Sequence, residues 1–320
     1  LSRRKFFKYA GAGGAVTVAA ACDQKPEKLI PMLVPPTNFE YTPHAGYQYM
    51  TTCTECEAAC GMMVTVRENR AQKAEGNPYH PLNQGTLCAR GQASMQTLYN
   101  PNRIARPSLN GKTISWEEGL QLFAEKLKEA SGDTVYLGRP LSGSDATFFE
   151  EWFGAVGGRR IAYRLLDDQS QREAGRICFG RADVPEYAFE KAEVIFNFGA
   201  DFLETTGNPV ENARRFADFH AYDGKKKREL IHFSPHVSLT GAKADRWVMI
   251  NPGSEAHAAL ALAHVIRKEK GNYGFLKEML DQYSPETVEK AVGVPAEKLH
   301  ELAMQFMKHS PGLAVAGGTV

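Results

Sequence analysis

Short apolar runs and longer amphipathic stretches alternate along residues 108–320. The apolar runs predict strands at 134–138, 160–163, 194–199, 229–233 and 247–250, because they are too short for helices. The amphipathic stretches predict helices at 115–130, 145–156, 168–178, 210–222, 255–268 and 295–308. Strands separated by helices of this length are typical of a parallel sheet covered on both faces. We therefore predict an α/β fold for this region, doubly wound and mostly parallel.

The first of these helices has the clearest pattern. Ser115 and Glu118 form a capping box at its start, and Leu120, Phe123 and Leu127 make up its apolar face. Another apolar run, at 313–316, predicts a further strand close to the last residue. Because the sequence starts with Leu1 and stops just after that run, we expect a fragment, truncated at both ends.

The first 46 residues have a different composition. Ser2-Arg3-Arg4-Lys5-Phe6-Phe7-Lys8 resembles a twin-arginine export signal, followed by an apolar stretch at 9–21 that is too short for a membrane span. Small residues precede Cys22 as in a lipoprotein cleavage site, although Ala19 replaces the usual Leu. We predict a signal at 1–22, export to the periplasmic face of the cytoplasmic membrane, and a lipid anchor on Cys22. Five prolines in 23–46 predict an extended linker.

Length and charge narrow the choice of fold and partners. A chain of 320 residues with 43% apolar residues can hold two domains, which we place at 47–107 and 108–320. The net charge of +1 gives no reason to expect a nucleic-acid partner. The smaller, amino-terminal domain at 47–107 is expected to contain short strands, one of them at 61–67.

Four of the six cysteines have the spacing of a cluster ligand set. Cys53, Cys56 and Cys60 lie within eight residues, and Cys88 follows after 27 intervening residues. A cubane [4Fe–4S] cluster needs four thiolates, and one short loop can supply three of them. Any disulfide pairing of the three close cysteines leaves one over, and zinc ribbons usually have a second C-x2-C pair. The pattern predicts a [4Fe–4S] cluster, with a zinc site as the second alternative and disulfides as the third.

The residues around the cysteines resemble a known family. The segments concerned are Asn77-Pro78-Tyr79-His80-Pro81, Gly85-Thr86-Leu87-Cys88-Ala89-Arg90-Gly91-Gln92-Ala93 and Leu98-Tyr99-Asn100-Pro101-Asn102-Arg103. They resemble the amino-terminal domain of the molybdopterin oxidoreductase (dimethyl sulfoxide reductase) family over about residues 47–107. The resemblance implies a [4Fe–4S] cluster beside a pyranopterin. It also makes Arg90 a catalytic candidate, because a family Lys or Arg at this place lies between the two anionic cofactors.

Three loops at the carboxyl ends of predicted strands resemble loops that hold the pterin nucleotide in that family. Their candidate residues are Gly199, Asp201 and Glu204, then Ser234 and Pro235, then Gly253, Ser254 and Glu255. The resemblance implies that they hold a molybdopterin guanine dinucleotide with Mo or W, if that cofactor is present. Open parallel sheets bind ligands at this edge. The alternative is that these residues only end strands and cap helices.

Two further segments, 198–205 and 238–247, resemble a narrower branch. It comprises the molybdopterin-like subunits of the periplasmic quinone reductase complex and of alternative complex III, which keep the fold without a molybdenum centre. Active family members supply a metal ligand from the loop at 165–171, where this chain offers only Asp167 or Ser170. We expect Asp168 to cap the next helix. We expect Cys178 to be a buried structural thiol.

Three functions follow from these patterns. The first is an iron–sulfur electron-transfer subunit of an exported, membrane-associated, quinone-linked respiratory oxidoreductase. The resemblance implies a ferredoxin-like iron–sulfur subunit and a quinone-interacting membrane subunit as its partners, with cytochrome c as a further candidate. The second is a catalytic Mo or W reductase of sulfur or other oxyanion substrates. The third is a cofactor-free scaffold lipoprotein.

Overall fold

The computed structural model describes residues 46–130, 132–141, 143–164, 168–222, 224, 227–271 and 276–317. The chain separates into two compact units, Leu1–Gly46 and Tyr47–Val320. The predicted signal and the linker up to residue 45 lie outside the described residues, and so does Asp167. The second unit is described below.

A three-stranded antiparallel sheet begins the second unit. Its strands are β1 (Tyr47–Thr52), β2 (Gly61–Arg67) and β3 (Arg70–Gly76), in the order β1-β2-β3. The prediction of a strand at 61–67 is confirmed by β2. Helix α2 (Ala89–Leu98) follows, and the strands β4 (Ser108–Leu109) and β5 (Lys112–Thr113) form a short hairpin. Our sequence analysis missed α2, because its glycine and polar residues leave no clear apolar stripe.

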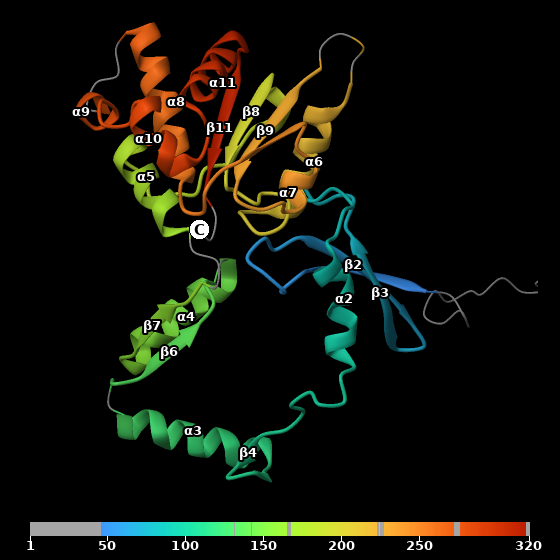
Figure 1. Ribbon diagram of the computed structural model, residues 1–320. Helices are drawn as coiled ribbons and strands as arrows, with labels where there is room; N and C mark the ends of the chain where they lie inside the picture. Colours follow the sequence, from blue (N-terminus) through green and yellow to red (C-terminus); the bar gives the residue numbers. More distant parts are fainter. Residues whose placement is uncertain are drawn as a thin grey trace, which may run out of the picture. The chain divides into compact units, whose positions relative to one another are not determined.

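Alternating helices and strands make up the rest of the described chain, as predicted (Figure 1). They are α3 (Trp116–Ala130), β6 (Val135–Gly138), α4 (Gly143–Val156), β7 (Arg159–Ala162), α5 (Gln169–Phe179), the 3-10 turn η1 (Phe189–Lys191), β8 (Val194–Phe198), α6 (Pro209–His220), β9 (Glu229–Ser234), α7 (Leu239–Ala242), β10 (Arg246–Met249), α8 (Glu255–Lys270), α9 (Lys277–Leu280), α10 (Pro285–Val292), α11 (Ala296–Lys308) and β11 (Gly312–Ala316). Every strand and helix predicted after residue 107 is present, with bounds shifted by at most two or three residues.

The strands of this region form two parallel sheets. Four of them pair in the order β10-β9-β8-β11, while β6 and β7 pair with each other in a separate two-stranded sheet. The sequence predicted parallel pairing but did not indicate that the strands divide into two separate sheets, because periodicity identifies strands without identifying their neighbours.

The four-stranded sheet is covered on both faces, as predicted (Figure 1). Alternate residues of β8 enter different cores, in keeping with the two-residue period of a strand. Val194, Phe196 and Phe198 pack with α8, α10 and α11. Ile195 packs on the opposite face, where Phe216 and Phe219 of α6 and Phe189 of η1 also lie. The strand is therefore buried from both sides, which explains its nearly continuous apolar sequence.

The apolar face predicted for α3 is not buried. Leu120 and Phe123 are 61% and 54% exposed, and no residue of α3 is buried in the described structure. The predicted helix bounds are confirmed, and the apolar face is largely uncovered. An amphipathic pattern shows which side of a helix is apolar, but not whether another element covers that side.

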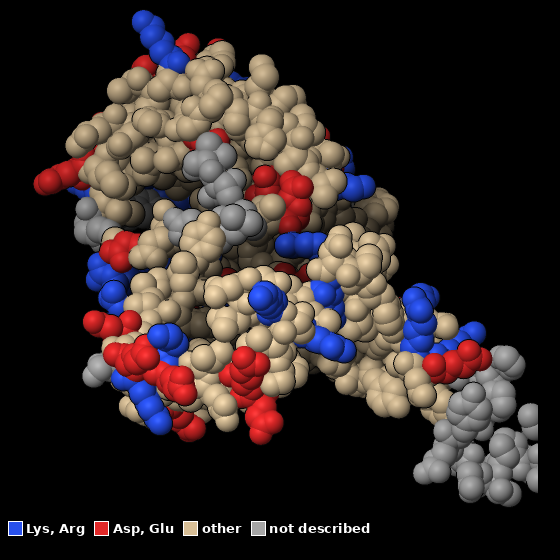
Figure 2. Space-filling model, turned by 90° about the horizontal axis from the view of Figure 1, so that it is seen from below, with Lys and Arg blue, Asp and Glu red and all other residues tan. Residues whose placement is uncertain are grey.

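The described surface carries both signs of charge. In Figure 2, Lys and Arg lie among Asp and Glu in the lower part and along the rim of the face shown, while most of its upper part is uncharged. Among the described helices, none combines the length and the apolar character needed to cross a bilayer.

Asp245 joins three elements beside the four-stranded sheet. Its Oδ2 accepts from the buried backbone N–H of Leu230 at 2.9 Å and lies 3.0 Å from His220 Nε2. Its Oδ1 lies 3.2 Å from Lys227 Nζ. Burial alone would raise the pKa of Asp245, but the Leu230 N–H, Lys227 and His220 together lower it.

We expect Asp245→Ala to lower the free energy of unfolding by about 1–3 kcal/mol at pH 7, because it leaves the Leu230 N–H without its partner. The folded-state pKa is lowered, so this stabilisation is present above the unfolded-state pKa of about 3.9 and is lost as pH falls through the folded-state value. Urea titrations of both proteins from pH 7 to pH 3 should show the difference shrink below about pH 4. A difference that stays constant to pH 3 would contradict this account.

Candidate functional site

The loop between β1 and β2 carries the three close cysteines. Antiparallel pairing places Thr52 opposite Gly61, so both ends of the loop meet. The Cys53 N–H donates to the Cys60 carbonyl at 2.8 Å. Cys88 lies immediately before α2, where the free amides of the first helical turn favour negative charge. The fold thus presents three cysteines on one closed loop and the fourth at a helix start.

Three of the four cysteines share one largely apolar environment, and Cys56 is half-buried on the same loop. Cys53 and Cys60 are buried with Met62, Val64, Ala74 and Val210, and Cys88 packs against this group. Burial raises the pKa of Cys60 to about 11, with smaller contributions from Cys56, Cys53 and Cys88. Burial also raises the pKa of Cys53. The pKa values of Cys53 and Cys60 are thus raised by other thiols of the set as well as by burial, which fits a common ligand set whose protons leave when metal binds.

Two observations on these thiols differ. The electrostatic influence of three cysteines on Cys60 places them close together. In the described residues, however, no three His, Cys, Asp or Glu side chains converge on a point that would suit one metal ion. In a [4Fe–4S] cluster each thiolate binds a different iron, so the four sulfurs lie farther apart than around a single zinc ion. The donor set fits the cluster.

Asn83 connects the two cysteine segments. It is fully buried, and its Oδ1 accepts from Gly61 N at 2.9 Å. Its Nδ2 donates to the carbonyl oxygens of Gly61 at 2.9 Å and Thr86 at 2.6 Å. Gly76 allows this loop to approach, since a Cβ there would lie 2.3 Å from the Thr86 oxygen. The sequence analysis did not identify Asn83, although its place five residues before Cys88 was available as a signal.

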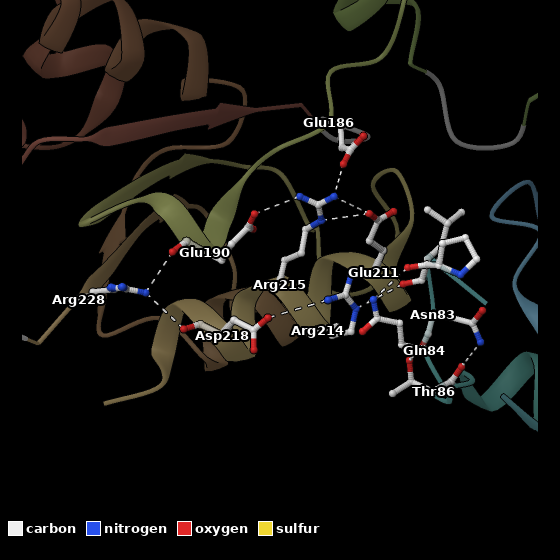
Figure 3. A network of polar contacts seen from close by, with 12 residues as sticks. Asn83, Gln84, Thr86, Glu186, Glu190, Glu211, Arg214, Arg215, Asp218 and Arg228 are labelled. Atoms are coloured by element: carbon white, nitrogen blue, oxygen red, sulfur yellow. Dashed lines mark hydrogen bonds and ion pairs between the residues drawn. The ribbon is translucent and has the colours of Figure 1, made fainter. Parts of the chain in front are cut away.

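Helix α6 lies beside the same loops. Its Val210 belongs to the apolar group around Cys53 and Cys60, and its Arg214 Nε donates to Leu82 O at 3.4 Å (Figure 3). On its other side, Arg215 pairs with three glutamates, Glu186, Glu190 and Glu211 (Figure 3). The α/β region therefore contacts the cysteine-bearing loops through the first two turns of one helix.

A cavity of about 490 Å³ lies beside the cysteine loop. Cys56 and the predicted Arg90 line it, together with two arginines that the sequence analysis missed, Arg139 and Arg164. Arg139 directly follows β6, and Arg164 comes two residues after β7. Both arginines therefore lie at the carboxyl ends of parallel strands, where open sheets bind ligands. This position in the sequence could have identified them as candidate site residues.

Both missed arginines also hold the cysteine loop. Arg139 Nη1 donates to the Thr54 carbonyl, and Arg164 Nη1 lies 2.9 Å from Glu57 Oε2. Glu55 and Glu57 line the cavity as well, so it contains carboxylates beside its three guanidinium groups. The arginines give this cavity a net positive character suited to an anionic ligand.

The predicted cofactor loops lie at the carboxyl ends of β8, β9 and β10, and two of them meet. Gly199 has φ of +71°, and a Cβ there would lie 3.0 Å from Glu255 Cγ. A side chain at 199 would therefore displace Glu255. Glu255 Oε1 is buried without a hydrogen-bond partner among the described residues. Gly199 and Glu255 thus lie in contact, and Glu255 Oε1 is free to accept a hydrogen bond from a ligand.

The other candidate residues of these loops make local contacts. Glu204 Oε1 accepts from Leu239 N at 3.2 Å, and the Asp201 carbonyl accepts from Thr205 N at 2.8 Å. Ser234 is buried and its hydroxyl donates to the His236 carbonyl, while Pro235 follows it half-buried. Ser254 Oγ donates to Asn251 O at 2.6 Å, and the exposed Gly253 has φ of +75°. None of the eight predicted loop residues lines the arginine cavity, so their cofactor role stays a prediction.

Two expectations about neighbouring residues were wrong. Asp168 stands at the N-cap position of α5, but its side chain does not cap the helix. It pairs with Arg164 at 2.7 Å and with Arg172 at 2.9 Å, because two guanidinium groups compete with the helix amides. Cys178 is exposed, because it lies on the outer side of α5. Ser170, the possible oxygen ligand, lines a second cavity with Cys178 and not the one beside Cys56.

Comparisons with known proteins agree with this geometry. Residues 48–100 match the family model described as the molybdopterin oxidoreductase Fe4S4 domain. The chain is 28% identical to the menaquinone reductase, molybdopterin-binding-like subunit of Nitratidesulfovibrio vulgaris, covering 99% of this chain and 48% of that protein. It is 23% identical to the arsenate respiratory reductase molybdopterin-containing subunit of a Shewanella species, covering 84% of this chain and 37% of that protein.

A solved structure shows the same fold. Acetylene hydratase from Pelobacter acetylenicus superposes with a TM-score of 0.65 and 19% sequence identity, over 83% of this chain and 40% of that one. The chain spans about half the length, or less, of the curated relatives it matches. The matched domain carries the cysteine loop, Asn83 and Cys88. Residues 48–100 therefore match the [4Fe–4S] domain of the molybdopterin oxidoreductase family, and the chain along most of its length is similar to proteins named as molybdopterin-binding or molybdopterin-containing subunits.

Proposed function

We propose that this protein is the iron–sulfur electron-transfer subunit of an exported, membrane-associated respiratory oxidoreductase that exchanges electrons with quinone. The observation that carries the proposal is the apolar group that Cys53, Cys60 and Cys88 share, with Cys56 on the same short loop as Cys53 and Cys60. The similarity along 99% of the chain to a menaquinone reductase subunit supports the quinone link. When bound, the cluster supplies one-electron transfer.

The protein's own residues hold and shield that centre. The four cysteines provide thiolates, and the apolar side chains of Met62 and Val64 limit access of water. Arg90, Arg139 and Arg164 place positive charge on the cavity side. Positive charge near an anionic thiolate cluster stabilises the extra electron of its reduced form. The predicted partners, a ferredoxin-like iron–sulfur subunit, a quinone-interacting membrane subunit and cytochrome c, belong to this proposal.

Metal analysis of anaerobically purified protein, combined with optical and paramagnetic resonance spectra, tests the proposal. About four irons per chain, with acid-labile sulfide and without Mo or W, is the expected result. Protein without iron and without labile sulfide would overturn it and support the scaffold function instead.

The cavity favours one second candidate, a catalytic Mo or W subunit carrying a pyranopterin. Three arginines beside Cys56 suit the phosphate groups of such a cofactor. The unpartnered Glu255 Oε1 offers an acceptor for the N–H groups of a guanine base. The similarity to the arsenate reductase subunit named as molybdopterin-containing agrees with this candidate. Stoichiometric Mo or W in the purified protein would replace the first proposal by the second.

We also propose export through the twin-arginine pathway, with Cys22 as the lipid anchor. The double substitution Arg3→Lys and Arg4→Lys should leave nearly all of the precursor in the cytoplasm, because both guanidinium groups define the signal. Lys8→Arg is the matched control, since it changes a basic residue in the same segment and keeps both arginines. Cell fractionation with immunoblotting measures the exported share, and normal export of the double variant would remove the localisation proposal.

A further inference from the structure

Asn83 is placed to set the distance between the near cysteines and the distant one. Its carboxamide makes three hydrogen bonds, two to Gly61 and one to the Thr86 carbonyl. Gly61 is the residue directly after Cys60, and Thr86 comes two residues before Cys88. Two residues of chain span at most about 7 Å, so fixing Thr86 confines Cys88 to a small region near Cys60.

The Asn83 side chain forms a junction between Gly61, next to Cys60, and Thr86, close to Cys88. The Cys60 side of this junction is held by more contacts than the Cys88 side. On the Gly61 side, β2 pairs with β1 and β3, and Cys60 accepts from Cys53 N. On the Cys88 side, the Asn83 side chain bonds the Thr86 carbonyl at 2.6 Å and so ties the loop to Gly61, whereas Thr86 N and Thr86 Oγ1 donate to the main-chain carbonyl of Asn83 within the loop itself. Losing the Asn83 side chain therefore releases the fourth cysteine more than the other three.

We propose that Asn83 is a positioning residue that holds Cys88 at the fourth iron of the cluster. The inference rests on the proposed function, because it takes the four cysteines as the ligands. Asn83 is fully buried, and its side chain hydrogen-bonds only backbone groups among the described residues, so its effect on the cluster passes through Cys88 and Cys60. Outer groups that orient metal ligands typically change metal affinity by about 10–100-fold when replaced.

Asn83→Asp is the sharpest test, because it keeps the shape and replaces the Nδ2 donor by an oxygen that faces two carbonyl groups. Ferricyanide, a one-electron oxidant, converts [4Fe–4S]²⁺ to [3Fe–4S]⁺, with release of one Fe²⁺ and one electron to the oxidant. We expect this conversion to be about 10–100-fold faster in the variant than in the unsubstituted protein. The paramagnetic resonance signal of the three-iron cluster measures it.

Alkylation with iodoacetamide after oxidation identifies the cysteine whose iron has been lost. Peptide mapping should find the label on Cys88 ahead of Cys60 in Asn83→Asp. Gln84→Ala is the matched control, because it removes a neighbouring carboxamide that is exposed and bonds only the Pro81 carbonyl. Iron loss in this control should match the unsubstituted protein.

The outcomes separate the inference from the proposed function. Iron loss from Asn83→Asp at the unsubstituted rate, or equal labelling of all four cysteines, overturns the positioning role and leaves the cluster in place. Failure of the unsubstituted protein to bind iron overturns the proposed function itself. If Asn83→Asp does not fold by circular dichroism, Asn83→Ala tests the same three side-chain bonds, and an unchanged rate or a loss of fold in that variant also counts against the positioning role.

Discussion

Cys56→Ser is expected to lower iron from about four atoms per chain to below one and to destabilise the folded protein. A serine hydroxyl is a poor substitute for a thiolate, so one corner of the cluster loses its ligand. Three thiolates remain, one fewer than the four that a cubane cluster needs. Iron and labile-sulfide analysis after anaerobic purification measures the loss.

Cys178→Ser is the matched control for this experiment. Cys178 is exposed on α5 and lies outside the apolar group around the other cysteines, so its replacement should leave iron content unchanged. Thermal unfolding of both variants then separates loss of the cluster from a general effect of removing a thiol. Unchanged iron in Cys56→Ser, or equal loss in both variants, would contradict the assigned ligand set.

Phe233→Ala is expected to cost about 3–5 kcal/mol of unfolding free energy. Phe233 lies on β9 in the centre of the four-stranded sheet and is fully buried. Its ring stacks on Phe198 with centroids 4.7 Å apart, and the Phe196 ring lies 5.7 Å away. Truncation leaves a cavity beside the strand end that carries Ser234, one of the predicted cofactor residues.

Urea unfolding followed by circular dichroism measures this cost. The midpoint should fall while the slope stays constant, because the variant changes stability without changing the surface exposed on unfolding. Phe179→Ala is the control, since Phe179 is 79% exposed and its loss should change stability by about 0.5 kcal/mol or less. A Phe233→Ala effect below about 1 kcal/mol would contradict the packing described for this core.

The chain order of the helices and strands after residue 107 could be predicted because local periodicity determines it. The apolar run at β8 was a clear case, since a strand buried on both faces needs apolar residues at nearly every position. The one polar residue in that run, Asn197, was not interpretable from sequence. In the structure Asn197 is fully buried, and its Nδ2 lies 2.8 Å from His232 Nδ1. This hydrogen bond depends on the register between β8 and β9.

The candidate site was predictable in part for the same reason. The cysteines form a recognisable pattern because three of them lie on one short loop, and Arg90 follows the fourth within two residues. Arg139 and Arg164 were not recognised, because they reach the cysteine loop from strands more than eighty residues away along the chain. Cys178 was placed wrongly in the interior, since a helical pattern does not show which side remains uncovered.

The sequence by itself determined the cysteine pattern, the resemblance of the amino-terminal domain to its family and the succession of elements, because cysteine spacing and hydrophobic period are properties of neighbouring residues. The tertiary structure alone decided that β6 and β7 pair apart from the larger sheet, that α3 keeps its apolar face exposed, and that Asn83 joins the two cysteine segments. These features depend on which distant segments come into contact, and contact between distant segments is fixed by packing of the whole unit rather than by local pattern.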